Sequence, residues 1–135
     1  MALITWDGSY SVNIADIDRQ HQKLMEMIND LDAAMRSGKG KEVLSKIIHG
    51  LVTYARTHFT TEESYFDKFG YADASSHKLE HSNFVRKVSQ FKDDFEKGRI
   101  GLSIEVMNFL SDWLKNHIKG TDKKYGPFLN EKGVH

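Results

Sequence analysis

The chain has 135 residues, with 19 basic and 19 acidic side chains and a net charge of zero when the histidines are neutral. This length suits one domain with a hydrophobic core, and the lack of a basic excess argues against a nucleic-acid partner. There is no cysteine, which excludes disulfides, thiolate nucleophiles and cysteine-ligated metal sites. Any metal site must therefore use imidazole and carboxylate ligands.

The start of the chain lacks the basic residues and long apolar segment of a secretory signal peptide. No apolar stretch approaches the roughly 20 residues that a transmembrane helix needs. We therefore expect a cytoplasmic protein without membrane insertion.

Residues 1–15 show turn residues and no helical period, which predicts an ordered N-terminal arm whose Trp6 packs against the domain. From about residue 16, apolar residues recur at spacings of three and four. This pattern predicts an amphipathic helix to about residue 37, with Asp16 or Asp18 as its cap. A Ser-Gly-Lys-Gly segment then ends the helix.

The same periodicity predicts three more helices, at about 41–68, 74–97 and 103–119. Gly70 and Gly98 follow two of them in the position that glycine favours after a helix. Residues 120–135, which contain the only proline, Pro127, are expected to form a C-terminal tail. Together the segments predict an all-α protein, an up-down-up-down antiparallel four-helix bundle with an N-terminal arm, in one domain over residues 1–135.

Two pairs of potential metal ligands flank the turn between the second and third predicted helices. His58 lies four residues before Glu62, and His77 lies four residues before His81. At 3.6 residues per turn, each pair stacks on one face of its helix. The four side chains can therefore point into one space.

Two further histidines belong to the same end of the predicted bundle. His21 lies near the start of the first helix and His117 near the end of the fourth, and these positions are adjacent in an antiparallel bundle. His49 lies nine residues before His58, about 180° round the helix, and should face solvent. His135 is the last residue and is not expected at the site.

Asp122 is a weaker candidate because it lies five residues past His117, about 140° off its face on a continuous α-helix. A helix end or bulge near Gly120 would return it to the site.

A single histidine on an apolar face is more often a hydrogen-bonded core residue than a ligand. Five imidazoles and two carboxylates without nearby inward Lys or Arg favour a metal centre, since unpaired buried charges are costly. Iron, manganese, zinc and copper all suit these ligands, and seven are too many for one ion.

The expected surroundings of the site are apolar and offer no obvious general acid. Such residues are usually core, and Glu63, next to Glu62, is expected to face solvent. An apolar wall and mostly neutral ligands predict a binding protein rather than an enzyme. The apolar candidates are Phe59, Phe66, Trp113, Leu114 and Ile118.

These residues also carry a family resemblance that covers essentially the whole chain. Its pattern resembles the hemerythrin signature at all seven ligand positions, in order, and the Trp6-Asp7 start is most similar to the single-domain bacteriohemerythrins. The matching segments are Ile17-Asp18-x-x-His21, His58-x-x-x-Glu62, His77-x-x-x-His81 and His117-x-x-x-x-Asp122.

The resemblance implies a non-haem di-iron centre with an oxo or hydroxo bridge that binds O2 reversibly. It also implies that Leu114 lines an O2 pocket, to which we assign Phe59, Trp113 and Ile118 as well. The implied ligands are His77, His81 and His117 for one iron, His21 and His58 for the iron with the open position, and Glu62 and Asp122 as bridges.

The expected function is oxygen transport, storage or delivery to an oxygen-consuming enzyme, with O2 as the ligand and the chain acting as a monomer. The alternatives are a di-iron oxidase or peroxidase, a nitric-oxide-handling enzyme, and an O2 or redox sensor. Iron storage is less favoured, because the ligands are mostly neutral.

Overall fold

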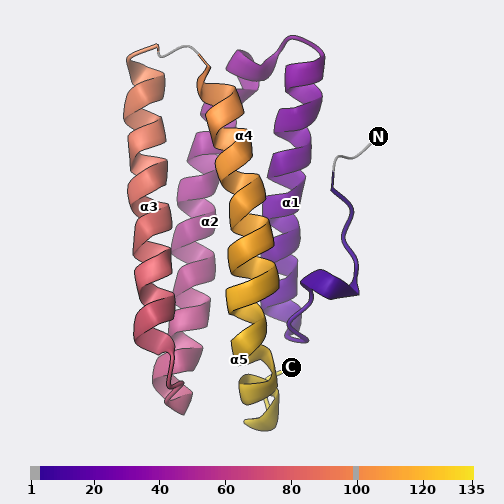
Figure 1. Ribbon diagram of the computed structural model, residues 1–135, viewed down its shortest axis with the longest axis vertical. Coiled ribbons are helices and arrows are strands. Elements are labelled where there is room, and N and C mark those ends of the chain that lie inside the picture. The colour runs from indigo at the N-terminus through magenta and orange to yellow at the C-terminus, as the bar shows by residue number, and fades with distance from the viewer. Residues whose placement is uncertain (1–3, 99–100) are drawn as a thin grey trace.

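The structure is a computed structural model that describes residues 4–98 and 101–135. Four long helical segments lie side by side and alternate in direction (Figure 1), which confirms the predicted all-α four-helix bundle. The fourth segment is continuous across three elements. The elements are η1 (Gly8–Tyr10), α1 (Ala15–Arg36), α2 (Gly40–Phe69), α3 (Ala74–Glu96), α4 (Leu102–Asp112), η2 (Trp113–Thr121) and α5 (Asp122–Glu131).

Local sequence explains how the first three helices begin and end, and their bounds lie within one residue of the expected ones. Helix α2 ends at Gly70, which has a φ of 69° and donates its N–H to the carbonyl of Phe66. Helix α1 has no side-chain cap. Asp16 and Asp18 instead lie in its first turn, where negative charge is favourable beside the free N–H groups.

The expectation of a helix end at residue 119 and a tail over 120–135 is wrong. The chain stays helical to Glu131, with Pro127 inside α5. Proline in a helix interior costs about 3 kcal/mol. Here Tyr125 and Leu129 are both fully buried, and the burial of two such side chains stabilises by an amount of similar size. Tertiary packing therefore outweighs the local effects of Gly120 and Pro127.

The N-terminal arm is tied to the bundle over its described residues, whereas residues 1–3 lie outside them. The main chain of Ile4 exchanges two hydrogen bonds with Asn29 of α1, at 2.9 and 2.8 Å. Asp18 accepts hydrogen bonds from the Ser11 hydroxyl and from a main-chain N–H. Trp6 packs against the main core, as expected.

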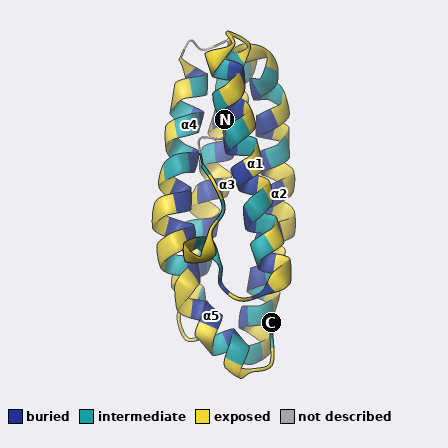
Figure 2. Cartoon of the chain, turned by 90° about the vertical axis from the view of Figure 1, so that its right-hand side faces the viewer, coloured by how far each residue is buried: buried dark blue, intermediate teal, exposed yellow. Residues whose placement is uncertain are grey.

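Apolar side chains form two clusters along the bundle, and Figure 2 shows the buried residues along the inward faces of the helices. The larger cluster fills the centre, and the smaller one closes the end where α5 and the arm meet. The smaller cluster consists of Val12, Ile14, Ile17, Phe66, Tyr125 and Leu129. In the described part of the chain, no helix is long and apolar enough to cross a membrane.

Candidate metal centre

The seven predicted ligands come together in one buried space that borders both apolar clusters. None of them is more than 2% exposed, although every one is polar or charged. Helix α1 contributes one, α2 two and α3 two, and the last two come from η2 and from the first position of α5. They are His21, His58, Glu62, His77, His81, His117 and Asp122.

A π-helix brings Asp122 to the site. Element η2 is a π-helix, in which hydrogen bonds join residues five apart, and the N–H of Asp122 donates to the carbonyl of His117. Residues five apart then lie nearly above each other, unlike in an α-helix. The bulge anticipated near Gly120 is therefore a π-helical segment nine residues long.

One group of ligand atoms is built around three histidines. The Nε2 atoms of His77 and His117 lie 2.8 and 3.0 Å from the same Asp122 oxygen, Oδ1. The Nε2 atom of His81 lies 3.1 Å from Oε1 of Glu62. One potential ligand atom from each of these five residues lies within 4.8 Å of those of the other four.

A second group shares both carboxylates with the first. His21 Nε2 lies 3.1 Å from Asp122 Oδ2, and His58 Nε2 lies 2.9 Å from Glu62 Oε1. The two Nε2 atoms are 3.0 Å apart. Asp122 therefore turns one oxygen toward each group, which is how a carboxylate bridges two metal ions.

The donor atoms fit metal ions better than they fit one another. Although the N···O separations are short, both carboxylates and the Nε2 atoms of His77, His81 and His117 lack hydrogen-bond geometry with any described group. Buried polar groups are otherwise almost always hydrogen-bonded. Lone pairs that converge on common points at these distances are the arrangement of metal ligands, and nitrogen with carboxylate oxygen suits iron.

Three histidines are oriented by acceptors outside the ligand set. His58 Nδ1 lies 2.6 Å from Gln20 Oε1, His81 Nδ1 lies 2.8 Å from Glu63 Oε2, and His117 Nδ1 lies 2.9 Å from Glu80 Oε1. An amide or carboxylate oxygen only accepts, so each Nδ1 must carry the proton. In the neutral form of each imidazole, which is the form that binds metal, Nε2 is then left with a free lone pair that points into the site.

Electrostatic interactions keep both carboxylates ionised. Burial alone would raise the pKa of Glu62, but His58 and His81 outweigh it and hold the pKa below its usual value. Burial acts on Asp122 in the same way, yet His117 holds the pKa of Asp122 well below its usual range.

The pKa values of His58 and His117 are shifted in opposite directions. Burial lowers the pKa of His58. It would also lower that of His117, but Asp122 and Glu62 outweigh burial and raise the pKa of His117 to about 9.

The four residues assigned to an O2 pocket are all buried. The Phe59 ring stacks on His81 and the Trp113 ring stacks on His117, each with 3.8 Å between ring centroids. Leu114 and Ile118 belong to the main apolar cluster. Aromatic and aliphatic side chains thus surround much of the ligand set.

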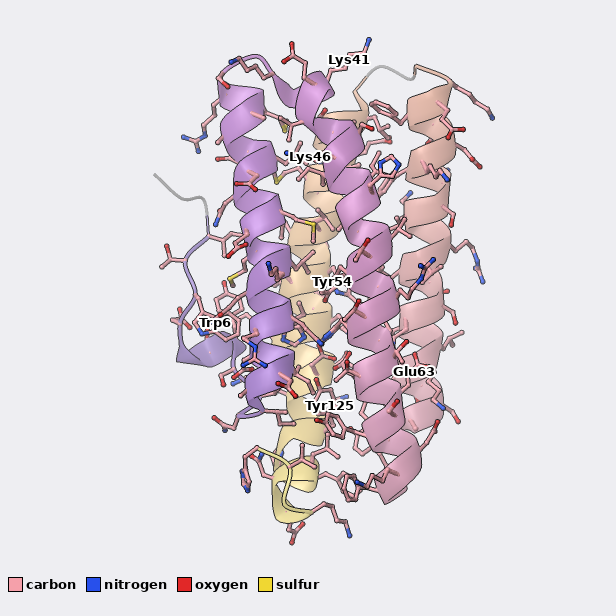
Figure 3. All side chains as sticks on the ribbon, turned by 180° about the vertical axis from the view of Figure 1, so that it is seen from behind. Trp6, Lys41, Lys46, Tyr54, Glu63 and Tyr125 are labelled. Atoms are coloured by element: carbon pink, nitrogen blue, oxygen red, sulfur yellow. The ribbon has the colours of Figure 1, made fainter. Side chains whose placement is uncertain are left out.

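Sequence reasoning missed a tyrosine at this site. The ring of Tyr54 stacks on His58, with 5.1 Å between centroids. Burial raises the pKa of Tyr54 well above its usual range, so its hydroxyl keeps its proton. In Figure 3, Tyr54 lies near the middle of the bundle and Tyr125 lies below it. Tyr54 is one turn before His58 on the same helix face, and this spacing could have identified it.

The expectation that Glu63 faces solvent is wrong, because it accepts the hydrogen bond of His81 and its side chain is only 33% exposed. Its position toward α3 is visible in Figure 3. Gln20 and Glu80 were also missed. Each of the three is next to a ligand in the sequence, but adjacency alone does not show which neighbour turns toward an imidazole. His49 and His135 are exposed, as expected.

Comparison with known proteins identifies the family. Residues 12–129 match the sequence profile of the Hemerythrin HHE cation binding domain. The chain belongs to the hemerythrin family. A bacteriohemerythrin of Methylococcus capsulatus (strain Bath) is 35% identical over 131 residues, which cover 96% of this chain and 99% of the relative. The resemblance predicted from the sequence is therefore confirmed.

Other hemerythrins agree in sequence and in fold. A bacteriohemerythrin of Pseudomonas aeruginosa (strain PAO1) is 36% identical over 93% of this chain and 80% of the relative. The crystal structure of a wild-type hemerythrin superposes with a TM-score of 0.82 at 34% identity, and covers 93% of this chain and 97% of that one. The crystal structure of a hemerythrin in which a leucine is replaced by alanine superposes on this chain with the same TM-score.

Proposed function

We propose that this hemerythrin-family protein binds O2 reversibly at a non-haem di-iron centre. The observation that carries the proposal is that two carboxylates, Glu62 and Asp122, belong to both a three-histidine and a two-histidine group of buried donors. In this proposal His77, His81 and His117 hold one iron ion. His21 and His58 hold the other, and the two carboxylates bridge the pair.

The number of donors supports one open coordination position. Two six-coordinate ions have about twelve positions. Five histidines fill five of them and two bridging carboxylates fill four, and an oxo or hydroxo bridge would fill two. The remaining position falls on the side with fewer histidines, where a small ligand such as O2 can bind.

The bound iron would supply one electron from each ion to O2, and the protein would keep this change reversible. We propose that Phe59, Trp113, Leu114 and Ile118 line the O2 pocket, since all four are buried. Their apolar side chains would exclude water and provide no carboxylic acid to assist cleavage of the O–O bond. This favours a non-catalytic carrier or store over an oxidase.

Visible spectroscopy of the iron-loaded protein tests the proposal. Two irons per chain are expected. The reduced protein should develop a charge-transfer band in air and lose it again under argon. Iron content far below two, or direct oxidation by air with turnover of an added reductant, would contradict it. The second result would favour a di-iron oxidase or peroxidase.

We propose a monomer in the cytoplasm that delivers O2 to an oxygen-consuming enzyme. An even charge balance supports a chain that diffuses freely rather than one that binds nucleic acid. Size-exclusion chromatography with light scattering tests the monomer, and a dimer mass at micromolar concentration would contradict it.

A further inference from the structure

In two histidines of the three-histidine group, the outer ring nitrogen donates a hydrogen bond to a carboxylate. His81 Nδ1 donates to Glu63 at 2.8 Å, and His117 Nδ1 donates to Glu80 at 2.9 Å. The side chains of Glu63 and Glu80 are 33% and 40% exposed, so their negative charges remain partly solvated. Two negative charges therefore lie directly behind two ligands of one metal position.

The two-histidine group has no such carboxylate among the described residues. His58 Nδ1 donates to the neutral amide of Gln20 at 2.6 Å. The other end of that amide is held by the Thr61 hydroxyl, at 3.3 Å, which orients the oxygen toward the histidine. The Nδ1 atom of His21 is buried without a described hydrogen-bond partner.

This difference changes the donor strength of the imidazoles. A carboxylate that accepts the Nδ1–H draws the proton toward itself and makes Nε2 more electron-rich, whereas an amide does so less. A more electron-rich imidazole stabilises a metal ion of higher charge. The two metal positions therefore differ in their outer hydrogen bonds as well as in their number of histidines.

We propose that Glu63 and Glu80 are positioning residues that make the three-histidine side of the centre the stronger site for the more highly charged ion. Gln20 leaves the two-histidine side the weaker site. This inference rests on the proposed di-iron centre. It assigns part of the inequality of the two irons to three residues outside the ligand set, in addition to the difference in the number of histidines.

Glu80 has a second contact that shapes the experiment. It also accepts a hydrogen bond from the Thr121 hydroxyl at 3.1 Å, and so joins α3 to both ends of the His117–Thr121 segment. The Glu80→Gln variant keeps an oxygen that can accept both hydrogen bonds and removes only the charge. Glu63→Gln does the same for His81, and Gln20→Glu adds a charge behind His58.

Nuclear magnetic resonance of the zinc-loaded protein provides a test without iron. The Nδ1–H resonances of His58, His81 and His117 are each compared between the wild-type protein and the variant that changes the acceptor, since the three hydrogen bonds differ in length. Glu63→Gln should shift the Nδ1–H resonance of His81 upfield, and Glu80→Gln should do the same for His117. Gln20→Glu should shift the Nδ1–H resonance of His58 downfield. The control is Glu42→Gln, which removes an exposed charge near the start of α2, away from the site.

Redox titration of the iron-loaded variants gives the second readout. Loss of the residue that accepts a hydrogen bond from a metal-ligating histidine typically costs 10- to 100-fold in metal affinity. If most of that loss falls on the ferric ion, each glutamate variant should raise one of the two one-electron potentials by about 59 mV or more, at 59 mV per tenfold change. Gln20→Glu should lower the other potential and bring the two closer together.

Two failures can be told apart. If the wild-type protein holds two irons and binds O2, but the glutamate variants change resonances and potentials no more than Glu42→Gln does, this inference is overturned and the proposed function stands. If the wild-type protein holds fewer than two metal ions per chain, the proposed function fails, and the inference fails with it.

Discussion

Burial divides the seven histidines of this chain into two sets. Five are at most 2% exposed and turn Nε2 toward two shared carboxylates. The other two, His49 and His135, are exposed, and the His49 ring bonds to the carbonyl of Ser45 on its own helix. Residue type therefore says little here, and helix face decides which histidines belong to the site.

This division predicts the outcome of two alanine substitutions. His117→Ala removes a buried donor of the three-histidine group and leaves Asp122 short of a partner. It should cost at least one iron per chain and about 2–4 kcal/mol of stability in the loaded protein. The matched control His49→Ala should leave the iron content unchanged. It should change the unfolding free energy by no more than about 0.5 kcal/mol. Equal effects in iron analysis and urea unfolding would refute the assignment by helix face.

The raised pKa of His117 predicts how pH acts on the metal-free protein. Its pKa is about 9 in the folded chain, against about 6.5 in an unfolded one. A group with a raised folded pKa contributes its full stability below the unfolded pKa, and loses it as pH rises through the folded pKa. Urea unfolding should therefore show a loss on the order of 2–3 kcal/mol from this group between about pH 6 and pH 10.

The control for this prediction is His117→Gln, which removes the titrating imidazole. Its unfolding free energy should fall less over the same pH range. An equal decline in both proteins would show that other groups cause the pH dependence.

At the scale of elements, the π-helix η2 decides the geometry of the site. It places Asp122 over His117 and lets the chain continue into α5. Two glycines flank this junction with different surroundings. A Cβ atom at Gly120 would meet nothing within 4 Å, whereas one at Gly126 would lie 2.9 Å from the carbonyl oxygen of Val12 in the arm.

These surroundings predict opposite effects of the same substitution. Gly120→Ala should stabilise the protein by about 0.4–1 kcal/mol, because it reduces the entropy of the unfolded chain without a clash. Gly126→Ala should destabilise it by about 1–3 kcal/mol, since α5 or the arm must move. Thermal unfolding of both variants checks this. A destabilised Gly120→Ala with unchanged iron content would show that η2 needs glycine for its backbone.

At the scale of the whole molecule, the metal centre lies where four helical segments must close around charged groups. The apolar clusters hold the helices together, but the site brings two ionised carboxylates within 4.8 Å of several imidazoles. Without a cation, buried like charges and unpaired lone pairs oppose that closure. Metal binding and the stability of the bundle should therefore be coupled.

Removal of the metal should lower stability measurably. A ligand that binds only the folded state stabilises by about 2.7 kcal/mol when its concentration is 100 times the dissociation constant. Chelation should therefore lower the melting temperature of the loaded protein, and added zinc should restore it. In a His58→Ala/His117→Ala variant, which lacks one histidine of each group, zinc should restore little. An equal recovery in that variant would mean that zinc acts elsewhere.

The sequence by itself determined the helical architecture and most of the site. Apolar periodicity predicts four antiparallel helices, and antiparallel packing brings His21, His58 and His117 to one end because the start of one helix lies beside the end of the next. This reasoning also separated His49 from the ligands, since it needs only the angle per residue. Such local rules depend on backbone geometry alone.

Tertiary structure decided what these rules leave open. Gly120 and Pro127 indicate a helix end, yet burial of Tyr125 and Leu129 extends the helix to Glu131. The roles of the residues behind the imidazoles depend on which neighbour a ring nitrogen meets across two helices, as for Glu63 and His81. Periodicity cannot supply that contact, because it fixes the face of a helix but not the distance to the next one.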